Sequence, residues 1–145
     1  MNGKMLCVDA GMVVRRVLFP QDTAVQSTWE SWEQEGCQVI APHLIFYEVT
    51  NVLYRYQRQG WLRQETVEIA LEAALALPIE LDGDANLYRR ARVLAAQFNL
   101  SAAYDAHYLA LAERLGVDFW TADQRLANAL HSYKLTWVRS PIPDL

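Results

Sequence analysis

Short apolar runs alternate with helical segments along the whole chain, and this alternation restricts the fold more than any other feature. The runs expected to form strands cover residues 4–8, 38–41, 79–81, 118–120 and 135–138. Between them, patterns with helical spacing and helix start or stop signals cover residues 12–18, 23–35, 43–59, 64–77, 84–98, 101–115 and 123–130. Strands separated by helices pair in parallel, with the helices covering both faces of the sheet. The sequence predicts one α/β domain over residues 1–145, a three-layer α/β/α sandwich with a central parallel sheet.

The composition is that of a globular protein. Apolar residues make up 52% of the 145 residues and charged residues 21%, and a chain of this length buries a substantial core without disulfides. The two cysteines, Cys7 and Cys37, lie in or beside apolar runs without metal-ligand spacing. We expect them to be buried and reduced, as in a cytoplasmic protein. The N-terminus has no signal-peptide pattern and no apolar run approaches the length of a membrane span.

Four acidic residues follow or face the expected carboxyl ends of the strands. They are Asp9, Glu48, Asp105 and Asp123. Ligands bind at this edge of parallel sheets, so all four carboxylates are predicted to gather there. Like charges at such short range require cations, and a set of oxygen ligands without Cys or His suits Mg²⁺ or Mn²⁺. One or two such ions indicate phosphodiester chemistry, and therefore a nuclease.

Each acid also has a purely structural interpretation. Asp9 and Asp123 are suited to cap helices, Asp105 would stabilise the first turn of a helix, and Glu48 could pair with Arg55 or Arg58. The formal net charge of −4 does not by itself favour the binding of nucleic acid. Two bound divalent ions, however, would bring the net charge close to zero. Arginine outnumbers lysine eleven to two, and arginine is the better bidentate phosphate ligand.

The segments around the four acids resemble the PIN-domain ribonucleases, and in size and layout the VapC-type toxins of bacterial toxin–antitoxin pairs. The resemblance rests on V-D-A after the first strand and on Y-E-V-x-N-V-L-x-R around Glu48. It also rests on L-S-A-x-Y-D-A-x-Y-L-A-L-A-E-R-L-G around Asp105 and on T-A-D-x-R-L-A around Asp123. Each motif is short, but four in this order span essentially the whole chain. The resemblance implies metal-dependent endonucleolytic cleavage of RNA, a homodimer, and an antitoxin partner that inhibits the acidic site.

The resemblance also implies roles for individual residues. Asp9, Glu48 and Asp105 match the three core metal-site acids, and Asp123 matches a fourth, more variable one. Thr121 matches a small hydroxyl residue beside that acid, where it could bond a ligand or water. These acids would act mainly as ligands, and one of them could accept a proton from the attacking water.

Further positions supplement or depart from this pattern. Asn51 matches a frequent family asparagine that could support the metal ligands, and helix packing explains it equally well. Arg15, Arg16 and Arg55 are candidate phosphate contacts, because they follow Asp9 along its helix or share the face of Glu48. Gly11 departs from the family, which often has Ser, Thr or Asn there. The lost side-chain hydrogen bond could weaken the binding of metal or substrate.

Three alternative functions can be compared with the sequence. A haloacid-dehalogenase-like phosphatase would need an Asp at position 11, and a receiver domain would need an acidic pair before its central Asp; neither is present. The third is a PIN-like binding module with weak or no activity, which the glycine at position 11 allows. Core or interface packing explains most of the aromatic residues, while Trp29, Trp32 and Trp61 are candidates for an exposed surface that would suit a second copy or a partner peptide.

Overall fold

Within the described part of the chain, five parallel strands form the central layer. The computed structural model describes residues 4–141. The strands are β1 (Met5–Val8), β2 (Gln38–Pro42), β3 (Ile79–Asp82), β4 (Asp118–Trp120) and β5 (Val138–Arg139), in the spatial order β3-β2-β1-β4-β5. Every neighbouring pair is parallel. The first four predicted strands are confirmed in position, whereas β5 is shorter than its predicted run of residues 135–138 and overlaps it only at Val138.

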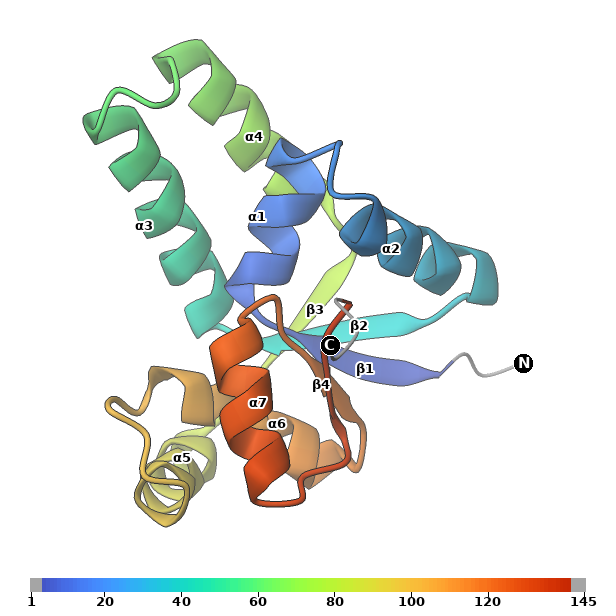
Figure 1. Cartoon of the computed structure of the whole chain (residues 1–145), viewed down its shortest axis with the longest axis vertical. Helices are drawn as coiled ribbons and strands as arrows, with labels where there is room; N and C mark the ends of the chain where they lie inside the picture. The colour runs from blue at the N-terminus through green and yellow to red at the C-terminus, as the bar shows by residue number, and fades with distance from the viewer. Residues whose placement is uncertain (1–3, 142–145) are drawn as a thin grey trace.

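Seven helices in the described part of the chain cover the two faces of this sheet. They are α1 (Ala10–Leu18), α2 (Thr23–Glu35), α3 (Leu44–Arg58), α4 (Gln64–Ala76), α5 (Ala85–Gln97), α6 (Tyr104–Leu115) and α7 (Gln124–Ser132). In Figure 1, α1 to α4 lie above the sheet and α5 to α7 lie below it. This arrangement confirms the predicted three-layer α/β/α sandwich. Within residues 4–141 no helix is both long enough and apolar enough to cross a membrane.

The strand order places a crevice between β1 and β4. The chain leaves β1 for β2 on one side and leaves β4 for β5 on the other, so the two connections diverge above the carboxyl ends of these neighbouring strands. Such a point of reversal is where open parallel sheets bind ligands. Asp9 directly follows β1, and two residues separate Asp123 from the end of β4. The topology therefore brings together two acids that are far apart in the sequence.

The helix ends follow the predicted signals closely. Asp9, Asp84 and Asp123 each cap a helix through a side-chain oxygen, as expected. Gly36 and Gly116 end α2 and α6 in the left-handed conformation that favours glycine. The helix predicted over residues 101–115, with Ser101 at the capping position, begins later: α6 starts at Tyr104 and has no side-chain cap.

Two expectations about exposure are wrong. Trp29 and Trp32 are buried, at 2% and 5% exposure. The Trp29 indole donates a hydrogen bond to the Met12 carbonyl, and Trp32 packs edge-on against both Trp29 and Trp120. The face that they share therefore joins α2 to the sheet. Trp61 is 68% exposed, as predicted.

The two cysteines are free thiols. Cys7 in β1 is fully buried, which agrees with the prediction, and burial raises its pKa to about 12. Cys37 is only half-buried, because it lies at the turn between α2 and β2.

Candidate active site

Asp9 is held in a fixed position at the carboxyl end of β1. Its side chain is almost completely buried. One carboxylate oxygen, Oδ1, accepts hydrogen bonds from the backbone N–H of Met12 at 3.0 Å and of Ala122 at 3.4 Å. The other, Oδ2, accepts a hydrogen bond of 2.5 Å from the Thr121 hydroxyl. Because these bonds come from α1 and from the loop after β4, the carboxylate links the two connections that border the crevice.

Thr121 connects Asp9 to Asp123. Its hydroxyl donates to Asp9 and accepts a hydrogen bond of 3.0 Å from the backbone N–H of Asp123. Asp123 in turn caps α7, since its Oδ1 accepts from the backbone N–H groups of Arg125 and Leu126. Thr121 is fully buried, so its hydroxyl has no access to bulk water. Its hydroxyl therefore contacts two of the predicted site acids, Asp9 through the side chain and Asp123 through the backbone.

Glu48 and Asp105 enter the crevice from two helices. Glu48 lies in the second turn of α3, and Asp105 lies in the first turn of α6. Tyr108, one turn after Asp105, donates a hydrogen bond of 2.5 Å from its hydroxyl to Oε1 of Glu48. The ring of Tyr108 is fully buried and stacks on Phe119 of β4. A side chain anchored in the core thereby fixes where the Glu48 carboxylate lies.

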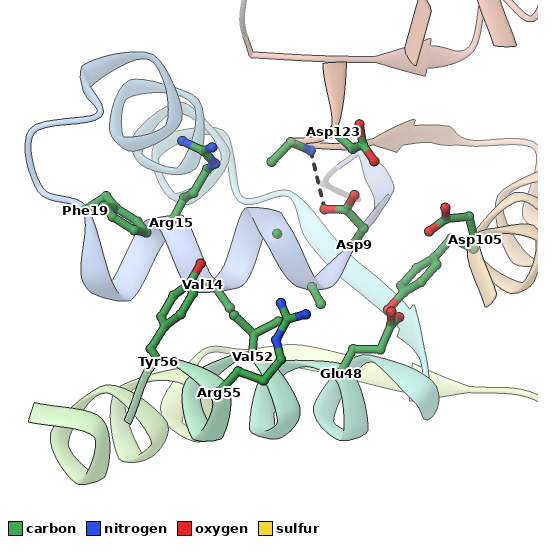
Figure 2. A pocket seen from close by; sticks show the side chains of 14 residues that line it. Asp9, Val14, Arg15, Phe19, Glu48, Val52, Arg55, Tyr56, Asp105 and Asp123 are labelled. Atoms are coloured by element: carbon green, nitrogen blue, oxygen red, sulfur yellow. Dashed lines mark hydrogen bonds between the residues drawn. The ribbon is translucent and has the colours of Figure 1, made fainter. Parts of the chain in front are cut away.

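All four predicted acids line one cavity of about 330 Å³. Figure 2 shows the four carboxylates around one end of it and the side chains of Arg55, Tyr56 and Phe19 further along. The rest of the lining comes from α1, α3, Tyr108 of α6 and the loop after β4. The cavity therefore combines an acidic end with an extension that offers arginine and aromatic groups.

Burial and the charges of neighbouring carboxylates raise the pKa of two of the four acids. Burial raises the pKa of Asp9 to about 6, against the lowering effect of its hydrogen bonds, and the charge of Asp105 adds to the rise. Burial also raises the pKa of Asp105, and the charges of Glu48 and Asp123 act in the same direction. For Tyr108, burial and the adjacent Glu48 carboxylate raise the pKa, so its hydroxyl stays protonated and remains a donor. These mutual effects show that the acids share one electrostatic environment.

The donor set suits a hard divalent cation, but the side chains do not already form a cage for one. Among residues 4–141, no three Asp, Glu, His or Cys side chains are arranged so that they could hold a metal ion as they stand. Repulsion between ionised carboxylates favours such a spread, and Asp9 and Glu48 are bonded to Thr121 and Tyr108. Four carboxylates on one cavity nonetheless offer the oxygen ligands that Mg²⁺ and Mn²⁺ prefer. The residues fit such an ion if Glu48, Asp105 and Asp123 turn inward.

The predicted phosphate contacts divide into two groups. Arg15 and Arg55 line the cavity, and Arg15 also pairs with Asp22 at 3.0 Å. Arg16 does not line it: its guanidinium pairs with Glu33 and bonds Gln26 on α2.

Two other polar residues lie outside the cavity lining. Asn51 is exposed on α3, so the structure does not bring it to the acids. The ring of His107 faces the Ala103 carbonyl and Tyr88. It therefore points away from Asp105, although it is close in sequence.

Sequence reasoning missed two features of the site. Tyr108 lies three residues after Asp105, and this spacing places both on the same side of a helix. The backbone of Gly11 lies close to Ala122 and Asp9. A Cβ at position 11 would lie 3.1 Å from the Cβ of Ala122 and 3.4 Å from Oδ1 of Asp9. The absence of a side chain at position 11 thus lets the loop after β4 approach α1 and bond Asp9. The need for glycine at position 11 follows from its contact with position 122, and the sequence pattern does not show that contact.

Comparisons with known proteins agree with this architecture. The model of the PIN domain family matches residues 7–130. Ribonuclease VapC3 of Pyrobaculum aerophilum is 29% identical over 125 residues, which cover 85% of this chain and 92% of the relative.

Solved structures share the fold at low identity. PAE2754 of Pyrobaculum aerophilum superposes with a TM-score of 0.69 at 22% identity, covering 97% of this chain and 92% of the other. VapC20 of Mycobacterium tuberculosis, a toxin that cleaves the sarcin–ricin loop, gives 0.63 at 14%, covering 86% and 94%. VapBC2 of Rickettsia felis, bound to a DNA fragment of its promoter, gives 0.66 at 10%, covering 94% and 98%. With the family model matching most of the chain, this protein belongs to the PIN domain family.

Proposed function

We propose that this protein is a metal-dependent endoribonuclease that hydrolyses RNA phosphodiester bonds through Asp9, Glu48, Asp105 and Asp123. The observation that carries the proposal is the placement of all four carboxylates on one cavity, at the reversal point of the sheet. Membership of the PIN domain family and the likeness to a relative named Ribonuclease VapC3 support RNA as the substrate. Acids that raise one another's pKa across a cavity are typical of functional sites.

The four acids would hold one or two Mg²⁺ or Mn²⁺ ions. A divalent cation bound there would supply the activation of water and the neutralisation of charge on the phosphate. The protein's own groups prepare this site: Thr121 and two backbone N–H groups fix Asp9, and Tyr108 fixes Glu48. An acid that is not engaged as a ligand can accept the proton of the attacking water. Asp105 suits this role, because burial and the charges of Glu48 and Asp123 raise its pKa.

The arginines on the cavity would orient the substrate. Arg55 forms no ion pair with the described residues, so its guanidinium can bind a phosphate without losing a partner. Arg15 would have to share its guanidinium with Asp22. Of the three arginines predicted from the sequence, Arg55 is therefore the strongest candidate for a phosphate contact, and Arg16 the weakest.

RNA cleavage by purified protein tests the proposal. A pool of structured RNAs would be incubated with Mg²⁺, with Mn²⁺ and with EDTA. We expect cleavage that needs the metal and that Asp9→Asn and Asp105→Asn both abolish. Asp118→Asn is the matched control, since Asp118 lies at the opposite end of the sheet and pairs with Arg139; it should leave cleavage unchanged.

Two results would contradict the proposal. Cleavage that survives both site substitutions would place the activity elsewhere. Folded protein that neither cleaves any RNA nor gains thermal stability with divalent ions would indicate a PIN-like binding module instead.

The likeness to VapC proteins further suggests the toxin of a toxin–antitoxin pair, acting as a homodimer with a protein inhibitor. Support comes from the ribonuclease relative and from the fold shared with VapC20 and VapBC2. Expression of the protein should arrest bacterial growth, and co-expression of the product of an adjacent gene should restore it. Light scattering of the purified protein would give the mass of a dimer. Unimpaired growth during expression of active protein would argue against the toxin role.

A further inference from the structure

A second cavity adjoins the active-site cavity. It also measures about 330 Å³, and three of its lining residues, Glu48, Asp105 and Asp123, line the first cavity as well. The two cavities therefore meet at these carboxylates. The rest of the second lining comes from the segment before α6 and from the start of α7: Leu100, Ser101, Ala102, Tyr104, Arg125 and Leu126.

Each cavity contains an arginine that pairs with no carboxylate of residues 4–141. Among the described residues, neither Arg55 in the first cavity nor Arg125 in the second forms an ion pair, whereas five other arginines do. Arg125 lies in the first turn of α7. A cation there opposes the helix dipole, so helix stability does not explain it. A negatively charged ligand in the cavity would.

Each cavity also contains aromatic side chains. Tyr56 and Phe19 line the first, and Tyr104 lines the second. Tyr104 is 62% exposed at the first position of α6, so its ring is open to a ligand. An arginine together with an aromatic ring is the combination that binds single strands, because the arginine contacts phosphate and the ring stacks on a base. This combination occurs on both sides of the carboxylates.

We infer that the second cavity binds the nucleotides on one side of the scissile phosphate, while the first cavity binds those on the other side. A single-stranded segment of RNA would cross the four acids, with Arg55 on one flank and Arg125 and Tyr104 on the other. Unpaired RNA is required because its bases can turn outward to stack on protein side chains. The inference rests on the proposed cleavage of RNA and extends it to a substrate path.

Fluorescence anisotropy with a labelled, unstructured RNA of about ten nucleotides tests the path. The titrations contain Mn²⁺, a gel verifies that the probe stays intact, and each variant is measured at several salt concentrations. We expect Arg125→Ala to raise Kd roughly three- to tenfold. It should also reduce the slope of log K against log salt by about 0.7, the value for one phosphate contact on a single strand.

Two further substitutions separate charge from stacking. Tyr104→Ala should raise Kd about fivefold or more without changing the salt slope, because stacking releases no counterions. Arg125→Lys should keep the wild-type salt slope. Arg92→Ala on α5 is the matched control: Arg92 is exposed and lines neither cavity, so Kd should not change.

The outcomes distinguish this inference from the proposed function. If Arg125→Ala and Tyr104→Ala bind the probe as tightly as the wild type, while Arg55→Ala binds it weakly, the strand does not cross the second cavity and the inference is overturned. RNA cleavage at the four acids would be unaffected by that result. A wild-type protein that neither binds nor cleaves RNA would overturn both proposals.

Discussion

Replacing Asp9 by Asn should stabilise the metal-free protein while it removes activity. The Asp9 carboxylate is buried, and burial raises its pKa from 3.8 to about 6. A group whose pKa is higher in the folded state contributes stability that is complete below the unfolded value and is lost as the pH rises through the folded value. Above about pH 6, ionised Asp9 therefore opposes folding, and a neutral amide at this position does not.

The magnitude follows from the difference in pKa. One pKa unit corresponds to about 1.4 kcal/mol, so ionised Asp9 costs the folded state about 3 kcal/mol at pH 8. Asn can still cap α1, because Asn and Asp are equivalent in this position, but it loses the favourable interaction of a charge with the helix dipole, worth about 0.3–1 kcal/mol. The net gain expected for Asp9→Asn is about 1–3 kcal/mol at pH 8. It should fall to zero or below at pH values under 3.8.

Urea unfolding in EDTA, followed by circular dichroism, measures this difference at several pH values. Added Mn²⁺ should reverse the order of stability, since only the wild type retains all four carboxylates to bind it. Asp118→Asn provides the control for a carboxylate that lies outside the cavity. If Asp9→Asn is less stable than the wild type by the same amount at pH 4 and at pH 8, burial of the charge does not set the cost, and the reasoning fails.

Three further substitutions test individual contacts of the site, each by urea unfolding. Thr121→Val should lower the free energy of unfolding by about 1–3 kcal/mol, because Asp9 and the Asp123 N–H both lose a partner; Thr121→Ser should lose less, and equal losses would refute the role of the hydroxyl. Gly11→Ser should cost about 1–3 kcal/mol through its close contact with position 122, and Ala122→Gly should recover part of it if that contact is the cause. Tyr108→Phe should cost about 1–2 kcal/mol and alter the Mn²⁺ affinity measured by calorimetry, whereas unchanged values of both would show that its hydroxyl does not hold Glu48.

Local signals in the sequence were sufficient to predict most element boundaries. Asp84, Asp123 and Gly116 mark helix ends through interactions with their own neighbours, so position in the chain is enough to identify them. A predicted helix boundary is wrong where a turn replaces the conformation that the capping residue would need. Ser101 is a good cap by residue type, but Asn99 has a positive φ of 52° and the chain forms a turn and bends before α6 begins. The helix consequently starts three residues later.

Contacts between distant segments could not be predicted in the same way. Helical spacing places Trp29 and Trp32 on one face, yet only the packing of α2 against Trp120 determines that this face is buried. The strand order is likewise a property of the sheet as a whole. The direction of Arg16, which turns toward Glu33 on α2, depends on that packing too. Sequence patterns therefore predicted that the four acids would lie together, as they do on the cavity, but could not determine which cationic side chains accompany them there.

The structural and the functional interpretations of the acids are compatible, because one carboxylate has two oxygens. Asp123 uses Oδ1 alone for both capping bonds to α7, which leaves Oδ2 available to a ligand. Asp9 caps α1 through Oδ1 and bonds Thr121 through Oδ2, and that second bond is the one that a cation would share or replace. In a parallel sheet, a residue that ends a strand and caps the next helix lies at the edge where ligands bind. A cap at this edge thus places a carboxylate beside the cavity where the proposed metal would bind, and the same residue can serve the fold and the proposed chemistry.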